Sequence, residues 1–395
     1  MYNKLWSKDF ILITIVNFLM YLIHYTLIVT VTKFAINQYH ASESMGGLAA
    51  GIFIIGMLFG RLFSGRIIDN LPPKRILFGG IIFSIIAVGL YYTIQSLSLL
   101  MIIRLVHGIA FGIASTATGT ISSRIIPDDR KGEGIGYYAL SVTLASAIGP
   151  FCGIVLNQHF GFESIFNVSL IAILLALIAT IFIKSLSKSE NQNSYNQETK
   201  GISAYLQIEA LPISIFVVFV GIAYSSVLSF LSVYTEQLNL ANVSSFFFVV
   251  YALSTFVTRP FTGKIYDHFG ENKVMYPVLI SFIIGLLLLG GTTTGIMLLI
   301  SAVFIGIGYG TIIPSAQAIA VQQSPKDKVG LATSTFFMFA DFGAGFGPFI
   351  LGVIIPYVGY SNLYLIMALV VLASVLLYYG LHGRKSHPQK SQTSQ

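Results

Sequence analysis

The chain of 395 residues is 55% hydrophobic and only 9% charged, which excludes an ordinary soluble globular protein. Its net charge of +7 does not indicate nucleic-acid binding, because the basic residues lie singly or in pairs between apolar runs, without interleaved aromatic residues. The single cysteine, Cys152, excludes an internal disulfide and a metal site built from several cysteines. We therefore expect a membrane protein with no metal or other cofactor.

Apolar runs of about 20 residues, the length that a helix needs to cross a bilayer, recur along the whole chain. The first run follows Lys4 and Lys8 and is interpreted as a retained span, because it is too long for a secretion signal and lacks a small-residue cleavage site. We predict twelve spans, at 10–32, 45–66, 76–95, 98–120, 134–156, 164–183, 211–235, 243–263, 275–293, 297–319, 330–355 and 361–381.

One polar segment divides these spans into two sets of six. It has the Ser, Asn, Gln, Lys and Glu content of a solvated linker. The predicted fold is an all-α membrane protein with its transmembrane helices in two pseudo-symmetric six-helix bundles. We expect the N-terminal bundle at 1–183, the cytoplasmic linker at 184–209, the C-terminal bundle at 210–383 and a cytoplasmic tail at 384–395.

The positions of lysine and arginine predict the orientation, because these residues favour the cytoplasmic ends of spans and short loops. With the N-terminus inside, all but two of the 22 basic residues lie in cytoplasmic segments or at cytoplasmic span ends. The exceptions are Lys33, which falls outside, and Arg104, which lies within a span. We therefore expect both termini to be cytoplasmic, and the short loops suggest a bacterial plasma membrane.

The two halves resemble each other at a fixed offset of 198 residues. Each half holds six spans, an even number, so both enter the membrane in the same direction and form parallel repeats. The aligned pairs are Arg61 with Arg259, Gly65 with Gly263, Asp69 with Asp267, Arg75 with Lys273, Gly108 with Gly306, Gly112 with Gly310, Pro127 with Pro325, Gly132 with Gly330, Gly149-Pro150 with Gly347-Pro348, and Gly161 with Gly359.

The loop after the second span and its copy after the eighth combine a glycine, an acid and basic residues. Each glycine can allow close helix approach, and each acid beside basic residues can form a charge latch near a helix N-terminus. One copy could reflect only topology and a turn, whereas two copies at one offset favour a latch. The residues are Gly65, Asp69, Lys74 and Arg75 in the first copy and Gly263, Asp267 and Lys273 in the second.

This loop resembles the signature of the major facilitator superfamily, Gly-x-x-x-Asp-x-x-Gly-x-Lys/Arg-Lys/Arg. Pro72 departs from it by standing where the signature has its second glycine, which affects the local turn. The resemblance covers the chain except the tails and the linker. It implies the major facilitator fold, a substrate site near the membrane midplane between the halves, and a role for Asp69 in stabilising one of two alternating conformations.

The fourth span places Arg104, His107, Phe111 and Ser115 on one helical face. A buried arginine in a membrane is costly, so Arg104 is a functional candidate. The resemblance agrees, because proton-coupled members of the family carry Arg-x-x-x-Gly in this span, with the arginine implicated in proton transfer; His107 replaces the commoner glutamine. The alternative is a structural arginine that snorkels to the outer interface.

The fifth span resembles the antiporter signature of drug exporters, Gly-x8-Gly-x3-Gly-Pro-x2-Gly. Four of its five fixed positions match, and alanine replaces one glycine: the residues are Gly136, Ala145, Gly149, Pro150 and Gly153. Small residues at these intervals let the helix lie close to a neighbour, and the proline bends it. Ordinary membrane-helix packing is the alternative, but within the resemblance the pattern favours export.

A carboxylate, Asp341, lies about eleven residues into the eleventh span and so near the midplane. Burial makes its protonated form much cheaper than its ionised form, so Asp341 is a candidate for carrying a coupled proton. The alternative is an acid paired structurally with Arg104 or with a backbone group.

Spans 1, 4, 7 and 10, which line the central cavity in the resembled family, carry aromatic and hydrogen-bonding residues. Such a surface suits an amphipathic and cationic solute, although helix packing explains any single tyrosine as well. Besides Phe111, the candidates for the substrate cavity are Asn17, Tyr21, His24, Tyr25, Tyr224, Tyr309 and Gln317.

The preferred interpretation is a secondary active transporter, not an enzyme, that exports small amphipathic compounds by proton-coupled alternating access. Its expected partners are a small-molecule substrate, protons and the lipid bilayer, without nucleic acid, and the expected state is a monomer. A symporter or uniporter for sugars or organic acids would share the fold, and a membrane sensor that transports nothing is a third possibility.

Overall fold

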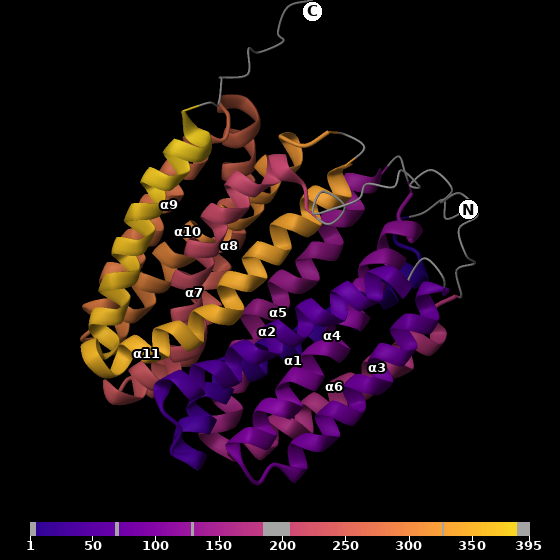
Figure 1. The fold of residues 1–395 in the computed structure, drawn as a ribbon, viewed down its shortest axis with the longest axis horizontal. Helices are drawn as coiled ribbons and strands as arrows, with labels where there is room; N and C mark the ends of the chain where they lie inside the picture. Colours follow the sequence, from indigo (N-terminus) through magenta and orange to yellow (C-terminus); the bar gives the residue numbers. More distant parts are fainter. Residues whose placement is uncertain (1–4, 68–70, 128–129, 185–205, 326–327, 385–395) are drawn as a thin grey trace, which may run out of the picture. The chain divides into compact units, whose positions relative to one another are not determined.

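The computed structural model describes residues 5–67, 71–127, 130–184, 206–325 and 328–384 (Figure 1). All regular structure in these ranges is helical, as predicted. Of the predicted linker at 184–209, residues 185–205 lie outside the described residues. The chain divides into two compact units, Met1–Asn196 and Gln197–Gln395.

The described residues of the first unit form six long helices. Helix α2 packs on α4, α1 packs on α5 and α6, and α3 packs on α4 and α6. The helices are α1 (Lys8–Tyr39), α2 (Glu43–Ile67), α3 (Pro73–Leu90), α4 (Leu97–Ile125), α5 (Lys131–Phe160) and α6 (Glu163–Phe182), with the short 3-10 helix η1 (Tyr91–Thr93) between α3 and α4.

The second unit repeats this packing: α8 packs on α10, α11 packs on α7 and α9, and α9 packs on α10. Its elements are the 3-10 helix η4 (Ile208–Ala210), α7 (Leu211–Gln237), α8 (Ala241–Phe269), α9 (Asn272–Gly290), α10 (Gly295–Gln322), α11 (Val329–Tyr378) and a terminal π-helical turn, η6 (Tyr379–Gly383).

The described residues form eleven helices long and apolar enough to cross a membrane, whereas we predicted twelve spans. The difference lies in α11, whose 50 residues would be about 75 Å long if straight, far more than a bilayer requires. Gly359 interrupts it with φ 76° and ψ 168°, at a kink between two helical arms, and α11 is visibly bent (Figure 1). The eleventh and twelfth predicted spans are therefore the two arms of one bent element. Its repeat counterpart Gly161, at φ 77°, separates α5 from α6.

Matching N-caps begin α4 and α10. The Ser96 hydroxyl accepts a hydrogen bond from the Leu99 amide at 3.3 Å, and the Thr294 hydroxyl accepts one from Met297 at 3.3 Å. These caps satisfy amide groups that have no partner within the helix. Since positions 96 and 294 differ by the repeat offset, the same local chemistry begins the same helix in each unit.

Close backbone contacts hold α2 against α4 and α8 against α10. A Cβ atom added at Gly108 would lie 2.0 Å from the Phe53 carbonyl oxygen, and one added at Gly306 would lie 2.4 Å from that of Tyr251. Both pairs occupy equivalent repeat positions. Small residues thus allow the backbones to approach in each unit, as they commonly do between membrane helices.

We expect Gly108→Ala to destabilise the first unit by about 1–3 kcal/mol, because the new methyl group must push α2 and α4 apart. Gly119 on the same helix is the matched control, since a Cβ there meets no atom within 4 Å. Thermal unfolding in detergent, followed by the reaction of Cys152 with a thiol dye, measures the effect. Equal midpoints for Gly108→Ala and Gly119→Ala would contradict this account of the α2–α4 contact.

Candidate functional site

Arg104 lies at the centre of a polar and aromatic cluster in the first unit. Its Nε donates to the Ala49 carbonyl oxygen at 3.1 Å and its Nη2 to that of Ala50 at 3.2 Å, both on α2. The guanidinium carbon is 4.6 Å from the centre of the Phe53 ring. The side chain is 0% exposed, so the proposed snorkelling to the outer interface is not observed.

Within the first unit, the contacts of Arg104 are with neutral groups. No described carboxylate of this unit forms an ion pair with it, and its Nη1 has no hydrogen-bond partner among the unit's described residues. Carbonyl dipoles and the face of an aromatic ring therefore take the place of a counter-ion. An incompletely satisfied guanidinium in an apolar bundle is costly, and such groups in membranes mark functional sites.

His107 lies one turn further along α4 and is also buried. Its Nδ1 is 3.1 Å from the Tyr91 hydroxyl, within hydrogen-bonding distance, and Tyr91 comes from η1. The Tyr91 ring stacks on Phe166 of α6, with ring centres 5.0 Å apart. Sequence reasoning missed Tyr91, because periodicity within one helix does not reveal a partner that another element supplies.

His24 of α1 joins the same cluster through Phe53, on which it stacks with ring centres 4.7 Å apart. Its ring centre also lies 5.1 Å from that of Tyr25 and 5.5 Å from that of Phe111. Tyr21 meets Phe111 edge to face at 5.0 Å. The structure therefore brings together four predicted cavity residues, and Phe53, which was not predicted, links them to Arg104. His24 is 7% exposed, and its Nδ1 has no hydrogen-bond partner among the described residues.

The second unit contains an aromatic cluster at related positions. Tyr224 of α7 stacks on Tyr309 of α10 with ring centres 3.7 Å apart, and it lies 5.7 Å from Tyr251 of α8. Tyr251 and Tyr309 are the repeat counterparts of Phe53 and Phe111. The predicted cavity residue Gln317 lies two turns beyond Tyr309 on α10 and is half-buried.

Asn17 was predicted to face a substrate cavity, yet it lies in a helix interface. Its Nδ2 donates to Ser141 Oγ at 2.8 Å, and its Oδ1 accepts from the Tyr138 hydroxyl at 2.8 Å and from Thr118 at 3.1 Å. The side chain is 1% exposed. Its amide therefore ties α1 to α4 and α5, and both of its polar atoms already have protein partners.

The antiporter-like residues of α5 pack on α1. A Cβ at Gly149 would lie 2.7 Å from that of Tyr25, and one at Gly153 would lie 2.7 Å from the Thr26 carbonyl oxygen. Pro150 is inside the helix, and Ala145 is buried. Gly136 belongs to α5, but its surroundings are outside the described residues. The close approach predicted from small residues is thus seen at Gly149 and Gly153.

The two copies of the loop motif differ in their turns. Gly270 has φ 81°, in the region that favours glycine, whereas its counterpart Pro72 has φ −56°. The predicted close helix approach is not seen at Gly263, where an added Cβ meets no atom within 4 Å.

Asp69 and the surroundings of Gly65 and Asp267 lie outside the described residues. Arg75 and Lys273 are exposed, and Lys74 binds backbone carbonyl groups at the end of α6.

Asp341 lies twelve residues into α11 and is half-buried. Twelve residues of helix correspond to about 18 Å, which is compatible with a position near the middle of the bilayer.

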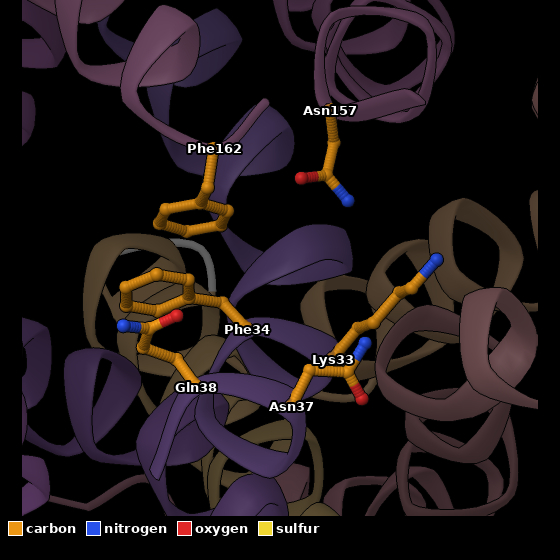
Figure 2. Close-up of a pocket in the computed structure, with 6 residues that line it drawn as sticks. All are labelled: Lys33, Phe34, Asn37, Gln38, Asn157 and Phe162. Carbon is orange, nitrogen blue, oxygen red and sulfur yellow. The ribbon is translucent and has the colours of Figure 1, made fainter. Parts of the chain in front are cut away.

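A small pocket opens in the first unit, where α1 ends beside the connection between α5 and α6 (Figure 2). Its volume is 220 Å³, below the range of about 300–1,000 Å³ for sites that hold drug-sized ligands. The pocket is therefore too small for a drug-sized ligand. Phe34 stacks on Phe162 at 3.8 Å to form one wall. Its lining residues are Lys33, Phe34, Asn37, Gln38, Asn157 and Phe162.

The sequence matches a known family over nearly its whole length. The sequence profile of the Major Facilitator Superfamily matches residues 13–290 and 241–395, which together span nearly the whole chain. The chain belongs to the major facilitator superfamily. It is therefore a multi-pass membrane transporter, as the loop motif and the internal repeat predicted, and its family carries out transport rather than enzymatic chemistry.

Curated relatives in this superfamily are similar over most of their length. The multidrug resistance protein MdtG of Escherichia fergusonii is 24% identical over 353 residues, covering 86% of this chain and 85% of that protein. MdtG of Dickeya zeae is 22% identical over 355 residues, covering 87% of each. An uncharacterized transporter of the same type from Methanocaldococcus jannaschii is 24% identical over 344 residues, covering 82% of this chain and 88% of that protein.

Crystal structures of other superfamily transporters share the fold. A mutant of the nucleoside transporter NupG aligns with a TM-score of 0.79 at 14% identity, covering 95% of this chain and all of that one. A bacterial homologue of the lysosomal transporter Spinster aligns with a TM-score of 0.73 at 14% identity, covering 96% of each chain. At this identity the likeness establishes the architecture, and the substrate must be inferred from this chain's own residues.

Proposed function

We propose that this transporter exports small amphipathic compounds in exchange for protons by alternating access. The observation that carries the proposal is the buried cluster around Arg104, in which a cation without a counter-ion among the described residues of its own unit lies beside His107 and His24. A uniporter for neutral sugars, which couples to no proton, would not require such a group. The multidrug-resistance relatives and the antiporter-like packing of α5 on α1 support export.

The proton is proposed to bind Asp341 when the site faces outward. Protonation removes the cost of an ionised carboxylate in the membrane, which is several kcal/mol at about the bilayer centre. Arg104 and His107 are proposed to respond to this change of charge. When the site faces inward, the proton leaves and the solute binds. A ligand can drive this cycle only through different affinities for the two conformations.

Aromatic surfaces are proposed to bind the solute. Tyr21, Tyr25 and Phe111 supply one such surface, and the stacked pair of Tyr224 and Tyr309 supplies the other. Ring faces attract cations and bury apolar area without demanding one hydrogen-bonding pattern. This suits a transporter with several amphipathic substrates.

Proton flux and solute movement in one preparation test the proposal. Inverted vesicles of a bacterial plasma membrane expose their cytoplasmic face, so a proton gradient with its acidic side in the lumen should drive compounds from a panel of amphipathic cations and neutral drugs into them. Purified protein in proteoliposomes should show proton movement that depends on the same compounds. If the gradient instead drove compounds out of inverted vesicles, the symporter alternative would replace this proposal.

The variant Asp341→Asn separates coupling from binding. Asparagine resembles a protonated carboxyl in shape but cannot release a proton, so we expect compound-dependent proton flux to be lost while compound binding and folding are retained. Tryptophan fluorescence or equilibrium dialysis measures binding, and a pH dye in the vesicle lumen measures flux. Full coupling in Asp341→Asn would reject this role for the carboxylate.

A further inference from the structure

The side chain at position 74 and its repeat counterpart at position 272 both bind the end of the last helix in their own unit. Lys74, at the start of α3, donates from Nζ to the Ile181 carbonyl oxygen at 3.1 Å and also to that of Ile183. Asn272, the first residue of α9, donates from Nδ2 to the Gly383 carbonyl oxygen at 2.8 Å. The contact is thus retained between the repeats although the side chain has changed.

The Lys74 contacts provide hydrogen-bond donors for carbonyl groups at the end of α6. The last carbonyl groups of a helix have no partner within the helix, and the helix dipole places partial negative charge on them. Ile181 lies in the last turn of α6, which ends at Phe182, and Ile183 is its C-cap. An ammonium group can satisfy two such oxygens at once because it has three hydrogens to donate.

Residues at the start of α1 also contact the end of α6. The Lys184 amide donates to Asp9 Oδ1 at 3.0 Å, and the Lys8 ammonium lies 5.3 Å from the centre of the Phe182 ring. The start of α1 and the start of α3 therefore both fix the end of α6. This is the point where the predicted linker leaves the first unit.

In the second unit, a different set of side chains forms the hydrogen bonds around η6. The other end of the Asn272 amide, Oδ1, accepts from the Tyr378 hydroxyl at 2.8 Å. His382 of η6 lies 3.1 Å from Glu271 Oε1 and 2.5 Å from Gln323 Nε2, at the end of α10. Neutral and paired groups here replace the Lys74 ammonium of the first unit.

We propose that Lys74 is a positioning residue that clamps the end of α6 to α3, and that Asn272 clamps the end of η6 to α9 in the same way. Together these contacts keep the third and last helices of each unit together while the unit moves. The inference rests on the proposed alternating access, in which each bundle must move as one body. Lys74, a basic residue of the loop motif, thereby has a structural role within its own bundle.

Hydrogen exchange of the full-length protein in nanodiscs tests the clamp without any transport measurement. In Lys74→Met we expect the amides of residues 180–184 to exchange about tenfold faster, because a hydrogen bond to a charged donor shifts a local opening equilibrium by at least that factor. Lys74→Arg should restore slow exchange. Arg75→Met, which removes the neighbouring exposed charge, should leave these amides unchanged. In the second unit, Asn272→Ala should accelerate exchange at residues 379–383.

Transport then distinguishes the clamp from the proposed function. A positioning role predicts a lower turnover rate in Lys74→Met with an unchanged KM for the exported compound, and recovery in Lys74→Arg. Unchanged exchange at residues 180–184 in Lys74→Met, or equal acceleration in Arg75→Met, would overturn the clamp whether or not the protein transports. Faster exchange in a protein that shows no proton-coupled transport would leave the clamp standing and reject the proposed function.

Discussion

Replacing Arg104 by methionine should abolish proton-coupled transport while leaving the protein as stable as before, or more stable. Methionine fills similar space in the apolar bundle but removes the charge and the hydrogen bonds to Ala49 and Ala50. Replacing a buried charged group by an apolar one of similar volume is often neutral or stabilising. We expect the transport rate to fall about 100-fold or more, which corresponds to losing about two charge-assisted interactions in the cycle.

Stability and transport must be measured on the same samples. The thermal midpoint in detergent reports folding, and the compound-dependent proton flux reports function. Ile102→Met serves as the control, because Ile102 lies on the same helix with its side chain 58% exposed on the surface of the unit. A lower midpoint in Arg104→Met would show instead that the arginine mainly fastens α4 to α2. Arg104→Lys should recover little transport, since one ammonium cannot reproduce a planar guanidinium that donates to two carbonyl groups over a ring.

The architecture could be predicted from the sequence because a bilayer imposes a length and a composition on each helix. The 198-residue offset also predicted structural detail: Gly161 and Gly359 share one backbone conformation. The eleventh and twelfth predicted spans are the two arms of α11, which meet at the non-helical backbone of Gly359. Ser361 and Asn362 follow this glycine, so polar residues mark this break as they mark other span ends.

The sequence predicted only those residues of the candidate site that lie together on one face of one helix. Arg104 and His107 share a face of α4, whereas Phe53 and Tyr91 reach them from other elements. Partners across helices depend on rotation and depth, which spacing does not reveal. The partners of Asn17 could not be predicted for the same reason, because its hydrogen bonds to Tyr138 and Ser141 connect residues far apart in sequence.

The second large effect is expected at the contact between α5 and α1. Gly149→Leu should reduce transport at least about tenfold, because a Cβ at this position already approaches the Tyr25 Cβ to 2.7 Å and the rest of a leucine must push the helices apart, at a typical cost of about 1–3 kcal/mol. Tyr25 and its neighbour His24 belong to the aromatic surface on α1. Displacing α1 from α5 therefore changes the cluster that surrounds Arg104.

Position 144 on the same helix supplies a matched control, because Leu144 is 54% exposed and can take added bulk without displacing a neighbouring helix. Leu144→Phe should retain transport in the vesicle assay. Gly149→Ala should have an intermediate effect, since alanine adds only the Cβ atom and not the rest of the leucine side chain. A graded loss from glycine through alanine to leucine would support a contact that must stay tight during the cycle. Normal transport in Gly149→Leu would mean that α5 can separate from α1 without disturbing the site, and the antiporter-like pattern would then be ordinary packing.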